Sequence, residues 1–517
     1  MTIDTLSLVE MLFSLILFII SILLFRKMRT LSLLHLFAGT LLLGYTVASL
    51  DPFLNLWDEQ FHALVAKNMM QSPFEPKLYR EALLNYDYRY WDRNYIWVHK
   101  QPLFLWQMAL SLKLFGVSTI SVRIPSILMH AILPLLVYRI GKISLNERIG
   151  FIAALLIAVA HFPLEIMAGK YSTDHNDMAF LFYVTASFWS FWEYKRSGKT
   201  IWLILIGVFS GGAVLIKWLL GLLIYPTWFL SHLIGNPERF NWKRYLPMAL
   251  AFLISCLVFI PWQLYIFHAF PVEASHEFGM ISRHLSEVIE GHGEERFYFF
   301  KSGLEVLYGK GDFVPYFLIL GIVLTIIKSK NGDARLLYIL PILIVYGVYT
   351  YAETKMPAFP MVVFPFVAIA IASVFFAFYH VFKCYIKSYL VRLIMGVLGF
   401  ASVSLLIFDY PRINENHFSE GDRSKELKEL LFFEKWKQND QQEMAVVFLD
   451  SFTYASHVPM MFYTDCIAYS GKPKQNYICQ LHKKNKKVIV LTETDNLTVD
   501  VHYVDTDNCV IDNRRTR

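Results

Sequence analysis

Long apolar stretches constrain the fold of this chain more than any other feature. A helix that crosses a bilayer needs about 20 mostly apolar residues, and roughly twelve stretches meet that condition. They lie near residues 8–25, 31–50, 122–141, 149–168, 178–195, 200–216, 219–235, 246–266, 313–328, 336–352, 358–380 and 390–409. Only 17% of the residues are charged, against about 25% in a typical soluble domain. We therefore expect an α-helical polytopic membrane protein with about twelve transmembrane helices.

Short basic loops predict how the chain lies in the membrane. Lysine and arginine cluster at 26–29, 194–196 and 383–387, and in further alternate loops. Such loops face the cytoplasm, so both termini are expected outside a cell inner (plasma) membrane. The same loops account for the net charge of +6. The expected partners therefore include membrane lipids and no nucleic acid.

The composition changes near residue 412, where polar and charged residues increase. We predict a transmembrane domain over 1–411 and a small extracytoplasmic α/β domain over 412–517. An amphipathic pattern indicates a helix over Arg423–Lys437, and short apolar runs at 444–449 and 488–491 indicate strands. Cys466 and Cys479 lie in this domain. They could form a disulfide or remain two thiols, and their spacing does not decide between these.

Two long outer loops, 51–121 and 267–312, carry most of the chemically active side chains. The first contains Asp58-Glu59, directly after the second apolar stretch, with His62 nearby. These acids could be a solvated pair or supply a general base, because a carboxylate can take a proton from an attacking hydroxyl. The apolar spacing that follows predicts an amphipathic helix on the membrane surface.

A second candidate in the same loop is His99-Lys100, just before the chain returns to the bilayer. Lys100 could extend along apolar surface toward water, or it could bind a phosphate. The chain has no glycine-rich phosphate loop. We therefore expect no nucleotide cofactor.

The order of these motifs resembles the protein mannosyltransferase and aminoarabinose transferase group of the GT-C glycosyltransferases. Asp58-Glu59 is followed by Lys100-x-Pro-Leu-x-x-Trp, Phe115-Gly116 and Arg123-x-Pro-Ser. The resemblance covers roughly residues 45–365, in a GT-C-like fold. The group usually has Lys-Pro-Pro, and Gln101 replaces the first of these prolines here.

The resemblance implies further site residues in outward-facing turns. A second acidic position matches Asp174, with Asp177 as a rival, and a lysine in an apolar segment matches Lys217. A Thr-Lys-x-Pro segment matches at Lys355. The aminoarabinose transferases bind a metal ion through a loop histidine, which matches His284 first and His292 second.

The resemblance also implies an activity. A sugar would move from an undecaprenyl- or dolichyl-phosphate donor to a protein, lipid A or glycan acceptor at the outer face of the inner membrane, with inversion. Asp58 would be the base, Glu59 and Asp174 would assist it, and the three lysines would bind the donor phosphate. A divalent ion (Zn²⁺, Mg²⁺ or Mn²⁺) at His99 and His284 could assist, and His62 is a further candidate.

Three other functions stay open at this point. A transporter or lipid flippase would also carry charges such as Lys217 inside the membrane, although no matching halves are visible in the sequence. A structural or assembly protein would explain the C-terminal tail but not the ordered motifs. An oligosaccharide ligase would keep the fold and change the chemistry.

Overall fold

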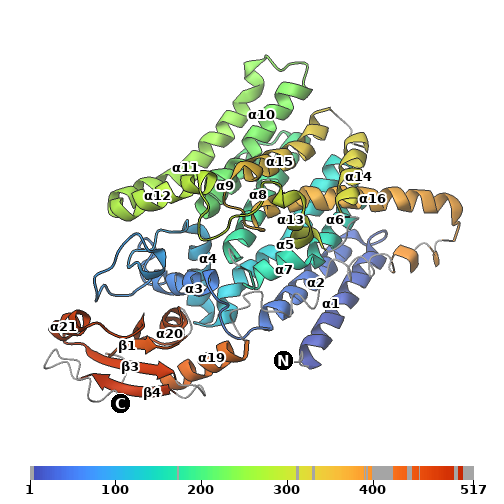
Figure 1. Ribbon diagram of the computed structural model, residues 1–517. Helices are drawn as coiled ribbons and strands as arrows, with labels where there is room; N and C mark the ends of the chain where they lie inside the picture. The colour runs from blue at the N-terminus through green and yellow to red at the C-terminus, as the bar shows by residue number, and fades with distance from the viewer. Residues whose placement is uncertain are drawn as a thin grey trace. The chain divides into compact units, whose positions relative to one another are not determined.

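A computed structural model describes residues 5–171, 174–309, 314–328, 332–388, 390–391, 394–396, 398, 423–438, 445–452, 455–493 and 499–504. Its elements are mostly helical, with four strands near the C-terminus (Figure 1). In chain order they are α1 (Thr5–Leu24), α2 (Arg29–Ser49), α3 (Asp58–Met69), η1 (Trp91–Arg93), α4 (Leu103–Phe115), α5 (Thr119–Ser144), α6 (Glu147–Val159), α7 (His161–Met167), α8 (Asp174–Ser197), α9 (Thr200–Lys217), η2 (Trp218–Leu222), α10 (Ile224–Gly235), η3 (Trp242–Tyr245), α11 (Leu246–Ala269), α12 (Pro271–Ser286), η4 (Tyr298–Phe300), α13 (Ser302–Tyr308), α14 (Val314–Lys328), α15 (Gly332–Tyr351), η5 (Phe359–Val363), α16 (Phe364–Tyr385), α19 (Arg423–Lys437), β1 (Ala445–Asp450), α20 (His457–Tyr463), β2 (Ile467–Ser470), α21 (Gln475–Lys483), β3 (Lys487–Glu493) and β4 (Val499–Val504).

The apolar stretches form helices, as expected. Each predicted stretch up to residue 380 coincides with helical structure, and the stretch at 149–168 is divided between α6 and α7. Among the described residues, six helical segments are long and apolar enough to cross a bilayer, or seven if α6 and α7, which meet at 51°, make one span. The predicted span at 390–409 lies largely outside the described residues. The count of twelve therefore stays a prediction.

Helix α11 exposes large apolar side chains, as expected for a helix surrounded by lipid. Leu253, Leu257 and Leu264 are 55%, 68% and 68% exposed. Large contiguous apolar patches are rare on soluble proteins, whereas the hydrocarbon core of a membrane favours them. The chain is a helical membrane protein.

The chain folds into two compact units, each assembled from segments that are distant in sequence. Unit 1 contains residues 1–50, 125–269 and 278–415, and unit 2 contains residues 51–124, 270–277 and 416–517. The boundary predicted between residues 411 and 412 falls outside the described residues. It stays a prediction.

In unit 1, small and hydroxyl side chains let helices approach closely. Ser14 of α1 donates to the Gly39 carbonyl of α2 at 2.6 Å. Gly207 and Gly211 of α9 have the small-xxx-small spacing that brings membrane helices together. A Cβ built on Gly211 would lie 2.7 Å from the Ser255 carbonyl oxygen of α11. The backbones of α9 and α11 are therefore nearly in contact.

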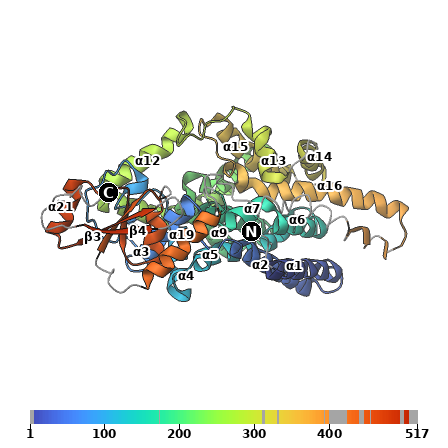
Figure 2. The same ribbon diagram turned by 60° about the horizontal axis from the view of Figure 1, so that its bottom comes forward.

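In unit 2, the C-terminal segment contains a mixed sheet with strand order β2-β1-β3-β4. Strand β1 is parallel to β2 and β3, and β4 is antiparallel to β3. Helix α21 lies beside β3 (Figure 2). The predicted helix coincides with α19, and the two predicted strands coincide with β1 and β3. Helices and strands alternate from α19 to β3 along the described part of this segment.

Two details in unit 2 differ from, or add to, the predictions. A helix forms after the acid pair as expected, with Asp58 as the first residue of α3, but most residues of α3 are buried, because it packs against α4 and α20. The prediction of a helix lying on the membrane surface is therefore wrong. Cys466 is not disulfide-bonded, and its Sγ lies 2.9 Å from Thr464 Oγ1.

The contact between α9 and α11 is testable by Gly211→Ala. The added methyl must push the helices apart, which should cost roughly 1–3 kcal/mol and lower the thermal unfolding midpoint in detergent. Gly347→Ala is the matched control, since a Cβ on this helical glycine meets nothing within 4 Å. An unchanged midpoint for Gly211→Ala would show that the helices do not approach so closely.

Candidate functional site

Asp58 and Lys100 form an ion pair in unit 2. Lys100 Nζ lies 3.6 Å from Asp58 Oδ2, and the two side chains are 18% and 13% exposed. Asp58 is the first residue of α3, and Trp57 before it has φ 69° and ψ −118°. A positive φ is strained for a bulky residue and persists only where the surroundings enforce it. The start of α3 is therefore held in a specific conformation that presents Asp58.

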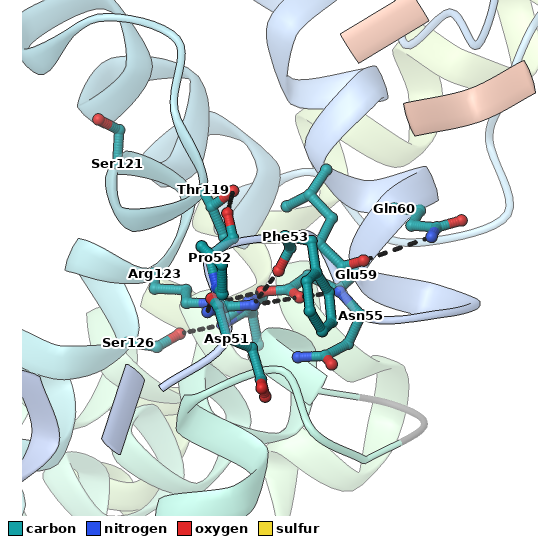
Figure 3. A network of polar contacts seen from close by, with 12 residues as sticks. Asp51, Pro52, Phe53, Asn55, Glu59, Gln60, Thr119, Ser121, Arg123 and Ser126 are labelled. Atoms are coloured by element: carbon teal, nitrogen blue, oxygen red, sulfur yellow. Dashed lines mark hydrogen bonds and ion pairs between the residues drawn. The ribbon is translucent and has the colours of Figure 1, made fainter. Parts of the chain in front are cut away.

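Glu59, the neighbouring acid, is in a very different environment. Its carboxylate is buried and accepts from Arg123, with Nε to Oε1 at 2.7 Å and a terminal guanidinium nitrogen to Oε2 at 2.8 Å (Figure 3). The backbone N–H of Asn55 donates to the same carboxylate at 2.6 Å. Paired arginine–carboxylate contacts of this kind are strong and directional. The Glu59 carboxylate therefore has a structural role, joining Arg123 to the turn before α3.

Arg123 also organises the turn that leads into α3. Its guanidinium donates to the carbonyls of Asp51 and Phe53 at 2.6 and 2.9 Å. One side chain thus satisfies two backbone carbonyls and the Glu59 carboxylate, as Figure 3 shows. Such a complete set of partners is what makes a buried guanidinium tolerable.

His99 engages an acidic residue from α12, still within unit 2. Its Nδ1 lies 3.0 Å from Glu277 Oε2, and its ring stacks on Trp91 with centroids 4.9 Å apart. Burial acts to raise the pKa of Glu277, but His99 opposes it with help from His276 and Lys100, and the net pKa is lowered. Glu277 is thus an anionic partner for His99.

His62, the remaining candidate in unit 2, lies in an aromatic environment. It is fully buried, with ring centroids 4.9 Å from Phe104 and 5.8 Å from Trp97. This packing gives it a structural role in α3.

In unit 1, Lys217 forms an ion pair with Asp177 of α8. Its Nζ also lies 4.8 Å from the centre of the Phe359 ring, within cation–π range. Asp177 is buried, with its side chain 3% exposed. Trp218, directly after Lys217, has a positive φ of 64°. Asp177, the rival of Asp174, is therefore the observed partner of Lys217, while Asp174 begins α8.

The histidine-bearing loop and the Thr-Lys-x-Pro segment meet in unit 1 through their backbones. The N–H of Thr354 donates to the His284 carbonyl at 3.2 Å, and the N–H of Lys355 donates to the His292 carbonyl at 2.8 Å. Lys355 is buried, and its Nζ donates to the Ala352 carbonyl. These contacts join the two segments and give Lys355 a local structural role.

The described residues give no geometric support for the predicted metal site at His99 and His284. Within the described ranges, no group of three or more His, Cys, Asp or Glu side chains is placed to hold a metal ion. His99 directs Nδ1 to Glu277 instead. Metal binding at His99 and His284 stays a prediction.

Two residues of unit 2 were not singled out as site residues from the sequence. Arg123 was visible only as part of Arg-x-Pro-Ser, where a cation at the start of an apolar stretch indicates a buried partner. Glu277 adjoins His276 in the second outer loop, where the sequence pointed to the histidines. A carboxylate beside a histidine was the available signal.

Comparison with known proteins agrees with the motifs. The family model for dolichyl-phosphate-mannose-protein mannosyltransferase matches residues 99–265. Two Bacillus subtilis (strain 168) proteins named as mannosyltransferases are 25% and 24% identical over 204 and 215 residues, which are 38% and 41% of this chain. The undecaprenyl phosphate-alpha-4-amino-4-deoxy-L-arabinose arabinosyl transferase of Pseudomonas aeruginosa (strain UCBPP-PA14) is 29% identical over 168 residues, 31% of this chain. The matches span only 28–29% of the length of these relatives.

Solved structures show the same fold over most of the chain. ArnT from Cupriavidus metallidurans bound to undecaprenyl phosphate has a TM-score of 0.65 at 13% identity, covering 90% of this chain and 93% of that one. The oligosaccharyltransferase AglB from Archaeoglobus fulgidus, in complex with an inhibitory peptide and a dolichol-phosphate, has a TM-score of 0.55 at 12% identity, covering 95% and 75%. Together with the ordered motifs, these matches support a GT-C superfamily glycosyltransferase.

Proposed function

We propose that this protein transfers a hexose or pentose from a polyprenyl-phosphate donor to an acceptor hydroxyl or amine, with inversion at the anomeric carbon. The observation that carries the proposal is the Asp58–Lys100 pair at 3.6 Å, partly exposed at the strained start of α3. A carboxylate next to an ammonium offers a base for the acceptor and a cation for a phosphate leaving group. The acceptor is a protein, a lipid such as lipid A, or a glycan.

The reaction needs two changes of charge. As the bond between the anomeric carbon and the phosphate oxygen breaks, the bonding electrons go to the phosphate, and the sugar becomes oxocarbenium-like. Lys100 stabilises the departing polyprenyl phosphate. Asp58 takes the proton of the acceptor as it attacks the opposite face of the sugar. In the resting protein Lys100 pairs with Asp58, and the donor phosphate competes for this ammonium.

The remaining residues act in supporting roles. Glu59 positions Asp58 through Arg123, and Glu277 orients His99. In unit 1, we assign an anion-binding role to Lys217, which ends an apolar helix and stays partly exposed beside its partner Asp177. The basic loops support an outward-facing site in a cell inner membrane.

Replacing the proposed base tests the chemistry directly. Asp58→Asn in proteoliposomes should abolish release of undecaprenyl phosphate from undecaprenyl-phosphate-linked mannose or aminoarabinose when extracted cell-envelope acceptors are supplied. The amide cannot accept the proton, so kcat should fall by about 100-fold or more. Asp87→Asn is the control, because this exposed acid pairs only locally with Arg89. Transfer at the wild-type rate by Asp58→Asn would contradict the assignment.

The neighbouring acid should respond differently. Glu59→Gln leaves the buried Arg123 guanidinium without its counter-charge, which should cost roughly 3–5 kcal/mol of stability. The thermal unfolding midpoint in detergent should fall sharply, whereas that of Asp58→Asn should change little. Glu81→Gln, in a half-exposed pair with Lys486, should cost at most about 1 kcal/mol. A thermal unfolding midpoint of Glu59→Gln equal to that of the wild type would show that Glu59 has no structural role.

The role of Lys217 is tested by binding of undecaprenyl phosphate in detergent. Lys217→Met should weaken binding about 10- to 150-fold, because a charge-assisted hydrogen bond to phosphate contributes roughly 1.5–3 kcal/mol. Lys199→Met is the matched control, since Lys199 is exposed next to the other end of α9. Equal affinities for the wild type and Lys217→Met would show that Lys217 only balances Asp177.

A further inference from the structure

Lys67, at the far end of α3 from Asp58, is bound by the C-terminal segment. Its Nζ donates to the carbonyls of Met461, Phe462 and Thr464 at 2.9, 2.8 and 2.7 Å. It also lies 3.3 Å from Asp465 Oδ1. The last carbonyls of a helix lack hydrogen-bond donors within that helix. At the end of α20, Lys67 supplies these donors. This contact fastens α3 to α20.

Tyr463, the last residue of α20, reaches the turn at the other end of α3. Its hydroxyl accepts from the Leu54 backbone N–H at 2.9 Å and lies 2.9 Å from Thr119 Oγ1. Thr119 Oγ1 donates its single proton to the Pro52 carbonyl at 2.8 Å, so the Tyr463 hydroxyl donates to Thr119. The bonds form one chain from Leu54 through Tyr463 and Thr119 to Pro52.

A third contact comes from the start of α19. Arg423 forms an ion pair with Asp51, whose carbonyl is bound by Arg123. Lys67, Tyr463 and Arg423 therefore link both ends of the segment 51–69 to the C-terminal segment. The acid pair lies between these attachment points.

We infer that Tyr463 and the end of α20 are positioning elements for Asp58, so that the C-terminal segment takes part in catalysis from within the same compact unit. The inference rests on the proposed function. An α-helix rises about 1.5 Å per residue and transmits a displacement along its axis. A shift at Lys67 or at the 51–57 turn therefore moves Asp58 relative to its substrate.

A second contact distinguishes the positioning of Asp58 from general attachment of the C-terminal segment to the rest of unit 2. Lys484, in the same C-terminal segment, donates to the carbonyls of Ala82 and Leu83 at 2.9 and 2.7 Å. This lysine–carbonyl contact resembles that of Lys67 in kind and joins the same two stretches of chain. It does not involve α3 or the turn before it, so it provides a matched control.

The test uses the full-length protein in proteoliposomes with undecaprenyl-phosphate-linked mannose or aminoarabinose as donor. Tyr463→Phe and Lys67→Met should each lower kcat about 10- to 100-fold, since displacements near 1 Å have effects of this size. The KM for the donor should change by less than about threefold, because the proposed mechanism assigns neither residue a contact with the donor. Lys67→Arg should recover part of the loss, since a guanidinium can also donate to several carbonyls. Lys484→Met should keep the wild-type kcat.

Amide hydrogen exchange provides a readout that does not require activity. Tyr463→Phe should accelerate exchange in a peptide covering residues 52–57, where Leu54 loses its acceptor, and leave β1 unchanged. A wild-type kcat for Tyr463→Phe, or an equal loss of kcat for Lys484→Met and Lys67→Met, would overturn the inference. If the wild type transfers no sugar but exchange responds as expected, Tyr463 still holds the 52–57 turn, whereas the proposed function and the catalytic role of the C-terminal segment fail.

Discussion

The buried pair between Glu59 and Arg123 is the interaction on which the candidate site depends. Charges in a low-dielectric interior are destabilising unless nearly every polar atom finds a partner. Arg123 meets this condition with the Glu59 carboxylate and the carbonyls of Asp51 and Phe53. The same bonds determine the path of the chain before α3. The bonds that stabilise the buried Arg123 guanidinium therefore also fix the backbone that orients Asp58.

Adjacent acids consequently have opposite roles. Asp58 stays partly accessible beside Lys100, while Glu59 is enclosed with Arg123. Successive residues at the start of a helix point about 100° apart, so one can face the interior while the other does not. The positive φ of Trp57 is the local strain associated with this arrangement. In unit 1, the partly exposed Lys217 of α9 pairs with the buried Asp177 of α8. Helix α9 also approaches α11 closely at Gly207 and Gly211.

Much of the fold follows from local sequence properties. The apolar stretches predicted their helices because hydropathy and length are local. Helix α19 followed from an amphipathic pattern, and β1 and β3 followed from short apolar runs. The surface placement of α3 was wrong because an apolar helix face does not specify its partner. Here that partner includes α20, almost 400 residues away in the sequence and outside any local pattern.

The sequence by itself determined that this is a helical membrane protein, because composition and the length of apolar stretches are local properties. Its ordered acidic and basic motifs resemble those of the GT-C glycosyltransferases. Tertiary structure alone decided which acid is buried, that Asp177 pairs with Lys217, and that Glu277 meets His99. It also decided that Tyr463 and Lys67 join the C-terminal segment to the helix that carries Asp58. The physical reason is that an ion pair or hydrogen bond depends on distance in space, which spacing along the chain does not specify.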